Sequence, residues 1–194
     1  MRTGRLIVGV TGASGTIYAQ RFLRAAAAQC DEIHLILSKQ AIQVAETEMG
    51  INLRAFAQDE GLSNITLCDE KSFYSPPASG SFRHDGMVIV PCSMGTAGRI
   101  ANGISNDLIT RAADVCLKES RPLIVVPREM PWNVIMLRNL TTLAEAGAKV
   151  LPACPAWYHK PQTLEDLADT VVARILQNLG LEQTLMKEWM RDED

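Results

Sequence analysis

The chain has 194 residues, of which 47% are hydrophobic and 21% charged, and its formal net charge is −3. A chain of this size and composition can bury a core without disulfides or metals and is typical of one globular domain. Its weakly acidic charge argues against broad binding to nucleic acid or to an anionic membrane, because both need a basic surface.

The cysteines and the apolar segments indicate the compartment. The five cysteines are an odd number without a Cys-x-x-Cys pair, so we expect reduced thiols. No apolar run is long enough for a membrane span, and the first one, residues 6–10, is too short for a secretory signal. We therefore expect a cytoplasmic protein that binds neither membranes nor nucleic acid.

Short apolar runs alternate with helical patterns along the chain. In chain order, the patterns predict a strand at 6–10, a helix at 16–28, a strand at 33–37, a helix at 39–48, a strand at 65–67, a loop at 69–85, a strand at 87–90 ended by Pro91, a helix at 104–118, a strand at 123–126, a helix at 134–146, a strand at 149–151 and a helix from Thr163. Asp166, three residues after Thr163, completes a variant of the capping box.

Strands separated by helices predict the fold class. We expect an α/β fold with a Rossmann-like, three-layer, doubly wound parallel sheet and right-handed crossovers. We further expect a single domain over residues 1–194, with a C-terminal tail over about 180–194.

Ligands of such folds bind at the carboxyl edge of the sheet, so the residues that follow each strand are the first candidates. Residues 11–15, Thr-Gly-Ala-Ser-Gly, join a strand to a helix, and their glycines and free N–H groups suit a phosphate. Residues 92–96 form a second small, hydroxyl-rich turn after another strand. Two such turns could hold one phosphate and one ring system, although each could also be a connecting turn without a ligand.

The charged residues and the tyrosine give weaker patterns. Arg128 and Glu129 directly follow a buried strand, which makes them better site candidates than charges on a helix surface. Lys118 ends a row of charges at helical spacing, a pattern typical of a solvated face with ion pairs. Arg174 lies beside the apolar stripe of the last helix. This position is typical of a surface arginine whose aliphatic part packs on the protein and whose guanidinium stays in water. Tyr158, in a loop between prolines, is by pattern a packing residue.

Taken together, seven segments in this order resemble the UbiX-type flavin prenyltransferases. They are residues 11–15, 38–39, 77–81, 91–93, 111–119, 121–129 and 158–162. The resemblance extends from about residue 5 to Trp189, nearly the whole chain. It implies an enzyme that joins the dimethylallyl group of dimethylallyl phosphate to N5 and C6 of reduced FMN without a metal. It also implies a homododecamer with sites at subunit interfaces, and a UbiD-type decarboxylase, of ubiquinone biosynthesis or aromatic acid metabolism, as recipient of the prenylated FMN.

The resemblance also implies roles for individual residues. Nine would hold FMN: Gly12, Ala13, Ser14, Ser38, Ser93, Met94, Gly95, Thr96 and Arg128. Four would hold the prenyl phosphate, whose charge must be met before it can leave: Lys118, Arg128, Tyr158 and Arg174. Three would move protons: Ser14, Glu48 and Glu129, with Glu46 as a second candidate for the position of Glu48. Trp189 would either shield an allylic cation in another subunit or pack on its own chain.

Three other functions stay open from the sequence. A flavin-dependent cysteine decarboxylase of the same superfamily needs a histidine at the flavin, and none of the three histidines lies in the helix after the first glycine turn. A non-catalytic FMN carrier would leave the predicted prenyl-phosphate residues without a ligand. A nicotinamide dehydrogenase is disfavoured by Ser38, because the second strand of that fold normally ends in an acid. The sequence also leaves open whether the prenyl donor is a monophosphate or a diphosphate.

Overall fold

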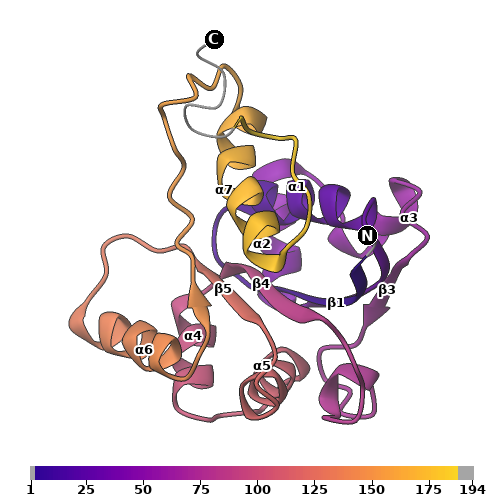
Figure 1. Cartoon of the computed structure of the whole chain (residues 1–194), viewed down its shortest axis with the longest axis vertical. Coiled ribbons are helices and arrows are strands. Elements are labelled where there is room, and N and C mark those ends of the chain that lie inside the picture. The colour runs from indigo at the N-terminus through magenta and orange to yellow at the C-terminus, as the bar shows by residue number, and fades with distance from the viewer. Residues whose placement is uncertain (1–2, 188–194) are drawn as a thin grey trace.

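The computed structural model describes residues 3–187, which form a central parallel sheet covered by helices (Figure 1). The sheet has six strands in the order β3-β2-β1-β4-β5-β6, and every neighbouring pair is parallel. The strands are β1 (Thr3–Val10), β2 (Cys30–Leu37), β3 (Ile65–Cys68), β4 (Gly86–Cys92), β5 (Leu123–Pro127) and β6 (Lys149–Val150). The strand order reverses between β1 and β4, which makes this the switch point of the sheet. The two turns predicted to bind a ligand, residues 11–15 and 92–96, follow these two neighbouring strands.

Helices cover both faces of the sheet, as the sequence predicts. They are α1 (Thr16–Ala27), α2 (Lys39–Met49), α3 (Leu53–Asp59), α4 (Met94–Ala101), α5 (Leu108–Lys118), α6 (Val134–Glu145) and α7 (Leu164–Leu179), with the 3-10 turn η1 (Pro76–Ala78). The core on one face is built with α1, α2, α3 and α7, and the core on the other with η1, α4, α5 and α6. The predicted three-layer, doubly wound α/β fold is therefore confirmed.

Successive side chains of a strand point to opposite faces of the sheet, so one sheet contributes to two hydrophobic cores. In β1, Leu6 and Val8 face the core with α1 and α7, whereas Ile7 faces the core with α5. Every residue of β4 and β5 is buried, as expected for strands that are covered on both sides. Such strands appear in the sequence as continuous apolar runs, and this is why they are predicted well.

Several predicted boundaries are wrong. The strand predicted to end at Pro91 continues through it to Cys92, with a register shift against β5. The helix predicted from residue 104 begins at Leu108, because Asp107 caps it: the Asp107 carboxylate accepts a hydrogen bond from the Thr110 N–H. The loop predicted over 69–85 contains the short turn η1, since proline suits the first positions of a helical turn.

Helices α3 and α4 are missing from the prediction. Helix α3 has only seven residues, too few to show a helical period. Helix α4 contains Gly95 and Gly98, which have low helix propensity, so its first residues resemble a plain turn. As a result, the predicted hydroxyl-rich turn is in fact a helix N-terminus.

The last helix begins and ends as its sequence indicates. Thr163 and Asp166 form the predicted capping box, in which each side chain accepts a hydrogen bond from the other residue's N–H group. Gly180 ends the helix in the left-handed conformation, at φ 75°. The chain then returns to the turn that follows α1, where Glu182 exchanges two hydrogen bonds with Gln29. Trp189 lies outside the described residues, and the single-domain division and the tail stay predictions.

Two further predictions concern thiols and membranes. Cys30, Cys68, Cys92 and Cys116 are buried, and Cys154 is exposed. Within residues 3–187, no helix is long and apolar enough to cross a bilayer.

Candidate functional site

The turns after β1 and β4 lie against each other at the carboxyl edge of the sheet. The Thr11 hydroxyl donates to the Pro91 carbonyl at 3.0 Å and accepts the Ser93 N–H at 2.7 Å. The Thr11 N–H also donates to the Pro91 carbonyl, at 3.2 Å. These bonds fix the relative position of two segments that are 80 residues apart in the chain.

A cavity of about 580 Å³ opens beside these turns. Five of the nine residues predicted to hold FMN line it: Gly12, Ser38, Ser93, Gly95 and Thr96. Helices α2 and α4 both begin at this cavity, capped by Ser38, which accepts the Ala41 N–H at 3.0 Å, and by Ser93, which accepts the Thr96 N–H at 3.3 Å. Two helix N-termini beside one cavity favour an anion, because their free N–H groups and dipoles both attract negative charge.

Gly12 makes this arrangement possible. A Cβ atom at Gly12 would lie 2.3 Å from the Gln40 Cβ, so the first turn of α2 packs directly on the Gly12 backbone. Gly15, at φ 110°, takes the left-handed conformation that turns the chain into α1. A glycine cradle between two helix N-termini, with hydroxyls and cations in its wall, fits the phosphate of FMN.

A second hollow, of about 480 Å³, lies beside the start of α1. Its lining includes Ser14, Tyr18 and Glu48, together with the first residues of α7. The Glu48 carboxylate accepts the N–H groups of Gly15, at 3.0 Å, and Thr16, at 2.9 Å. Because Gly15 has no side chain to cap α1, Glu48 reaches across from α2 and does so.

The same contacts set the protonation of Glu48. Burial alone would raise the pKa of this carboxyl, but hydrogen bonds from Ser14, Thr16 and Gly15 outweigh it and hold the pKa below its ordinary value. Glu48 is therefore a carboxylate at neutral pH, able to accept a proton. The alternative residue, Glu46, is exposed on α2 and makes no side-chain hydrogen bond within the described part of the chain.

We predict that Glu48→Gln lowers the free energy of unfolding at pH 7 by about 1 kcal/mol, the usual contribution of a helix cap. A lowered folded-state pKa means that the carboxylate stabilises the fold above the ordinary pKa of 4.5, and that this contribution is lost as the pH falls through the folded value. Urea unfolding of the parent protein and of Glu48→Gln should therefore show a difference in the free energy of unfolding at pH 7 that disappears in acid. Glu46→Gln is the matched control, and an equal gap for that variant would contradict the assignment.

Arg128 connects the end of β5 to the first turn. Its Nε donates to the Ser14 carbonyl at 3.1 Å, and its N–H donates to the Cys92 carbonyl at 3.2 Å. Glu129 is exposed next to it, and its carboxylate accepts the Met130 N–H at 3.0 Å. Tyr18, which the sequence does not single out, lies close by: burial and Cys154 raise its pKa, and Arg128 opposes them.

Two of the predicted FMN residues offer only their backbone. The side chain of Met94 is buried in the core with α5 and α6, and Ala13 is buried as well. Cys92 is also a packing residue, because burial raises the pKa of its thiol to about 12 and keeps it protonated.

The predicted prenyl-phosphate residues come from separate parts of the chain, and two of them, Lys118 and Arg128, lie at opposite edges of the sheet. Lys118 ends α5 at the amino edge of the sheet, where it pairs with Glu119, while Arg128 lies beyond β5, which spans about 16 Å. Arg174 is ten residues into α7, about 15 Å along its axis, and donates to Gln177 at 2.6 Å. Tyr158 is exposed in the extended connection between β6 and α7, with its ring 4.1 Å from that of His159 (Figure 1).

Lys118 nevertheless lies in an ordered polar environment. A Cβ atom at Gly80 would lie 2.8 Å from the Lys118 Nζ, so the ammonium rests on the Gly80 backbone. Arg121 holds this loop through hydrogen bonds to the carbonyls of Gly80, at 2.6 Å, and Phe82, at 2.7 Å. The hydroxyls of Ser79 and Ser81 are hydrogen-bonded to each other at 2.8 Å beside it.

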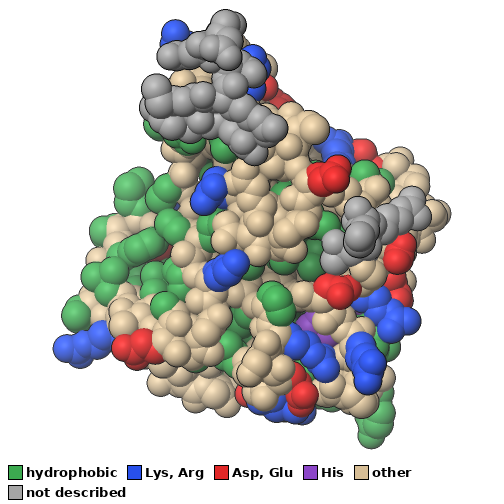
Figure 2. Space-filling model, in the orientation of Figure 1, with side chains coloured by type: hydrophobic (Ala, Val, Ile, Leu, Met, Phe, Trp, Pro, Cys, Tyr) green, Lys and Arg blue, Asp and Glu red, His purple; other side chains and the backbone are tan. Residues whose placement is uncertain are grey.

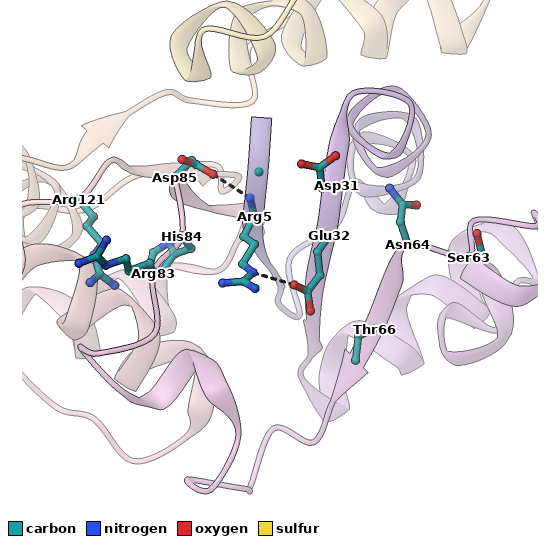
Figure 3. Close-up of a pocket in the computed structure, with 11 residues that line it drawn as sticks. Arg5, Asp31, Glu32, Ser63, Asn64, Thr66, Arg83, His84, Asp85 and Arg121 are labelled. Carbon is teal, nitrogen blue, oxygen red and sulfur yellow. Dashed lines mark hydrogen bonds and ion pairs between the residues drawn. The ribbon is translucent and has the colours of Figure 1, made fainter. Parts of the chain in front are cut away.

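A third cavity, of about 850 Å³, is at the opposite, amino edge of the sheet (Figure 3). None of the predicted site residues lines it. Some of its charges meet one another, since Arg5 pairs with Glu32 at 2.9 Å and donates its backbone N–H to Asp85 at 2.7 Å. Burial lowers the pKa of His34 and His84, which flank the Phe82 ring next to this cavity. This cavity lies apart from the two hollows at the carboxyl edge of the sheet.

Sequence reasoning missed part of the wall of the phosphate cavity. Besides Lys39, which belongs to the segment 38–39 that carries the resemblance, its further polar lining includes Lys71, Arg99 and Asn106 and the carboxylates of Glu70 and Asp107. Arg99 follows Thr96 by three residues, so the helical spacing of α4 could have pointed to it if α4 had been predicted. Among residues 3–187, no group of histidine, cysteine and acidic side chains could hold a metal ion.

Comparison with known proteins agrees with this geometry. The flavoprotein family model matches residues 1–176. The flavin prenyltransferase UbiX of Synechocystis sp. is 45% identical over 195 residues, covering 95% of each chain. The chain belongs to the UbiX flavin prenyltransferase family.

Solved structures of this family are similar over almost the whole chain. AnUbiX (PadA1), solved in complex with FMN and dimethylallyl pyrophosphate, superimposes with a TM-score of 0.91 at 37% identity, covering 99% of this chain and all of that one. A dodecameric FMN-dependent UbiX-like decarboxylase from Escherichia coli O157:H7 gives 0.90 at 39% identity, covering 96% and 99%. The cysteine decarboxylase TvaF, at 19% identity and 0.63 over 91% and 98%, shares the fold.

Proposed function

We propose that this chain transfers the dimethylallyl group of dimethylallyl phosphate to N5 and C6 of reduced FMN. The product would be the prenylated cofactor of a UbiD-type decarboxylase. One observation carries the proposal: in a chain of this family, the turn of residues 11–15 lines two hollows. Gly12 lines the cavity at which the two serine-capped helices begin, and Ser14 lines a second hollow together with Glu48. The first fits a flavin phosphate, and the second offers a hydroxyl and a carboxylate for proton transfer.

Each residue group would have a distinct task. FMN, when bound, supplies the nucleophilic ring atoms. The residues of the first cavity would bind its phosphate: Gly12, Ser38, Ser93, Gly95 and Thr96, with the backbones of Ala13 and Met94. Arg128 fixes the first turn through the Ser14 carbonyl and would offer its free N–H groups to the prenyl phosphate. Glu48 and Glu129 would accept or return protons near the ring and the leaving phosphate.

Assembly would bring the remaining phosphate residues to each site. Because Lys118 and Arg128 lie at opposite edges of the sheet, and Arg174 lies far along α7, we propose that neighbouring subunits complete each site. The relative from Escherichia coli is dodecameric, which supports a homododecamer here. Helix α6 offers a surface for assembly: it exposes Val134, Ile135 and Leu137, and hydrophobic side chains gather over this part of the molecule at the left of Figure 2.

A mass measurement tests the function. Anaerobic incubation with reduced FMN and dimethylallyl phosphate should release phosphate and yield a flavin heavier by one isoprene unit, whereas Arg128→Ala should release unmodified FMN. The diphosphate donor in a parallel reaction shows which leaving group the enzyme accepts. Recovery of only unmodified flavin with both the monophosphate and the diphosphate donor would contradict the proposal.

The alternatives have their own readouts. Loss of carbon dioxide from a cysteine peptide with oxidised FMN would indicate a cysteine decarboxylase, and tight FMN binding without any reaction would indicate a carrier. The cytoplasm as location, and the partner decarboxylase, stay predictions.

A further inference from the structure

Arg99 lies in the wall of the cavity that fits the flavin phosphate. Its side chain is one-third exposed and is held at three points: it donates to Asn106 at 2.6 Å and to the Thr96 hydroxyl at 3.2 Å, and it forms an ion pair with Asp107. The other cations of this wall, Lys39 and Lys71, are exposed and form no ion pair among the described residues. Arg99 is therefore the cation of this wall whose position is fixed, in a lining that also contains the carboxylates of Asp107 and Glu70.

The contact with Thr96 has a directional consequence. The Thr96 hydroxyl oxygen accepts hydrogen bonds from Arg99 and from the Ser93 hydroxyl, at 3.1 Å. Its own proton therefore has to point away from both donors, and within the described part of the chain no acceptor takes it. Thr96 is only 3% exposed, so a buried hydroxyl is left to donate to a ligand oxygen in the cavity.

We propose that Arg99 selects the phosphate of FMN, both by its charge and by turning the Thr96 hydroxyl into a donor. This inference rests on the proposed function, because it takes the cavity to be the phosphate site. A phosphate dianion gains from a fixed guanidinium and from an oriented hydroxyl, whereas riboflavin, which has no phosphate, gains from neither. Arg99 is thus a specificity-determining residue for FMN against riboflavin.

A purely structural role is the competing explanation. Asp107, the partner of Arg99, caps α5 by accepting the Thr110 N–H at 2.8 Å, so the ion pair also connects α4 to the start of α5. If Arg99 served only this connection, its removal would loosen both helices and weaken every flavin equally. The two roles therefore differ in the ratio of the FMN and riboflavin affinities.

The test compares dissociation constants for oxidised FMN and riboflavin, measured by quenching of flavin fluorescence. Arg99→Met should weaken FMN binding by about tenfold to a hundredfold and leave riboflavin binding unchanged, and Arg99→Lys should recover part of the loss. Arg54→Met, at an exposed position of helix α3, removes an equal charge away from the cavity and should change neither constant. Equal weakening of both flavins, or of neither, by Arg99→Met would overturn the proposal.

A second variant separates the guanidinium from its ion pair. Asp107→Asn keeps a side chain that caps helices well but removes the negative charge beside Arg99. FMN binding should then stay as tight or become tighter, and a loss as large as that of Arg99→Met would refute a direct role for the guanidinium. Prenyl transfer by the unchanged protein, followed by flavin mass, is measured separately. A failure of this inference is therefore distinguishable from a failure of the proposed function.

Discussion

Lys118→Met is expected to lower prenyl transfer by at least about a hundredfold while FMN binding stays unchanged. Removal of a cation that stabilises a leaving phosphate has effects of this size. FMN binding should not change, because Lys118 lies at the amino edge of the sheet and outside the flavin cavity. Rates of product formation, followed by flavin mass, and FMN titration of the same preparation give the two quantities.

The same variant tests whether sites are shared between chains. If Lys118 of one chain completes the site that contains Arg128 of another, then Lys118→Met and Arg128→Met chains produced together should form oligomers with some intact sites. Random assembly predicts activity in about a quarter of the sites. Each variant alone should be inactive, and so should the double variant produced with either of them. Absence of recovery in the mixture would mean that both residues act from one chain.

Gly12→Ala is expected to abolish FMN binding at micromolar concentrations and to destabilise the fold by about 1–3 kcal/mol, the usual effect of overpacking. The added Cβ would lie 2.3 Å from the Gln40 Cβ, so the first turn of α2 must move and take the Ser38 cap with it. Flavin retained during purification and urea unfolding report the two losses. Normal FMN retention in this variant would contradict the role given to the glycine cradle.

Gly95→Ala is the matched control for the fold. A Cβ atom at Gly95 has no neighbour within 4 Å among the described atoms, and Gly95 lies in the first turn of α4. Alanine favours helix over glycine by about 0.5–1 kcal/mol, so this variant should be as stable as the parent protein or more so. A loss of stability as large as that of Gly12→Ala would show that the clash with Gln40 is not the cause.

The sequence predicts those parts of the fold that depend on local patterns. Continuous apolar runs mark the buried strands, and the Thr163 and Asp166 pair marks the start of α7. The parallel order then places residues 11–15 and 92–96 at one edge without any further information. The two hollows at this edge are thus foreseeable in outline.

Other parts depend on contacts between distant segments, which local patterns do not show. Glu48 is distinguished from Glu46 only by its reach to the N-terminus of α1, a contact across 32 residues. Arg99 joins the site through α4, whose glycines hide the helix. Lys118 and Arg128 are ten residues apart in sequence but at opposite edges of the sheet, so their joint role depends on assembly rather than on the fold of one chain.

The cysteines differ in burial, and this difference allows the assembly of subunits to be studied by labelling. Four thiols are buried, while Cys154 is exposed close to Tyr18, near the carboxyl edge of the sheet. A maleimide dye should therefore attach once per chain without mutagenesis. Energy transfer between dyes on different subunits could then follow the exchange of chains in real time.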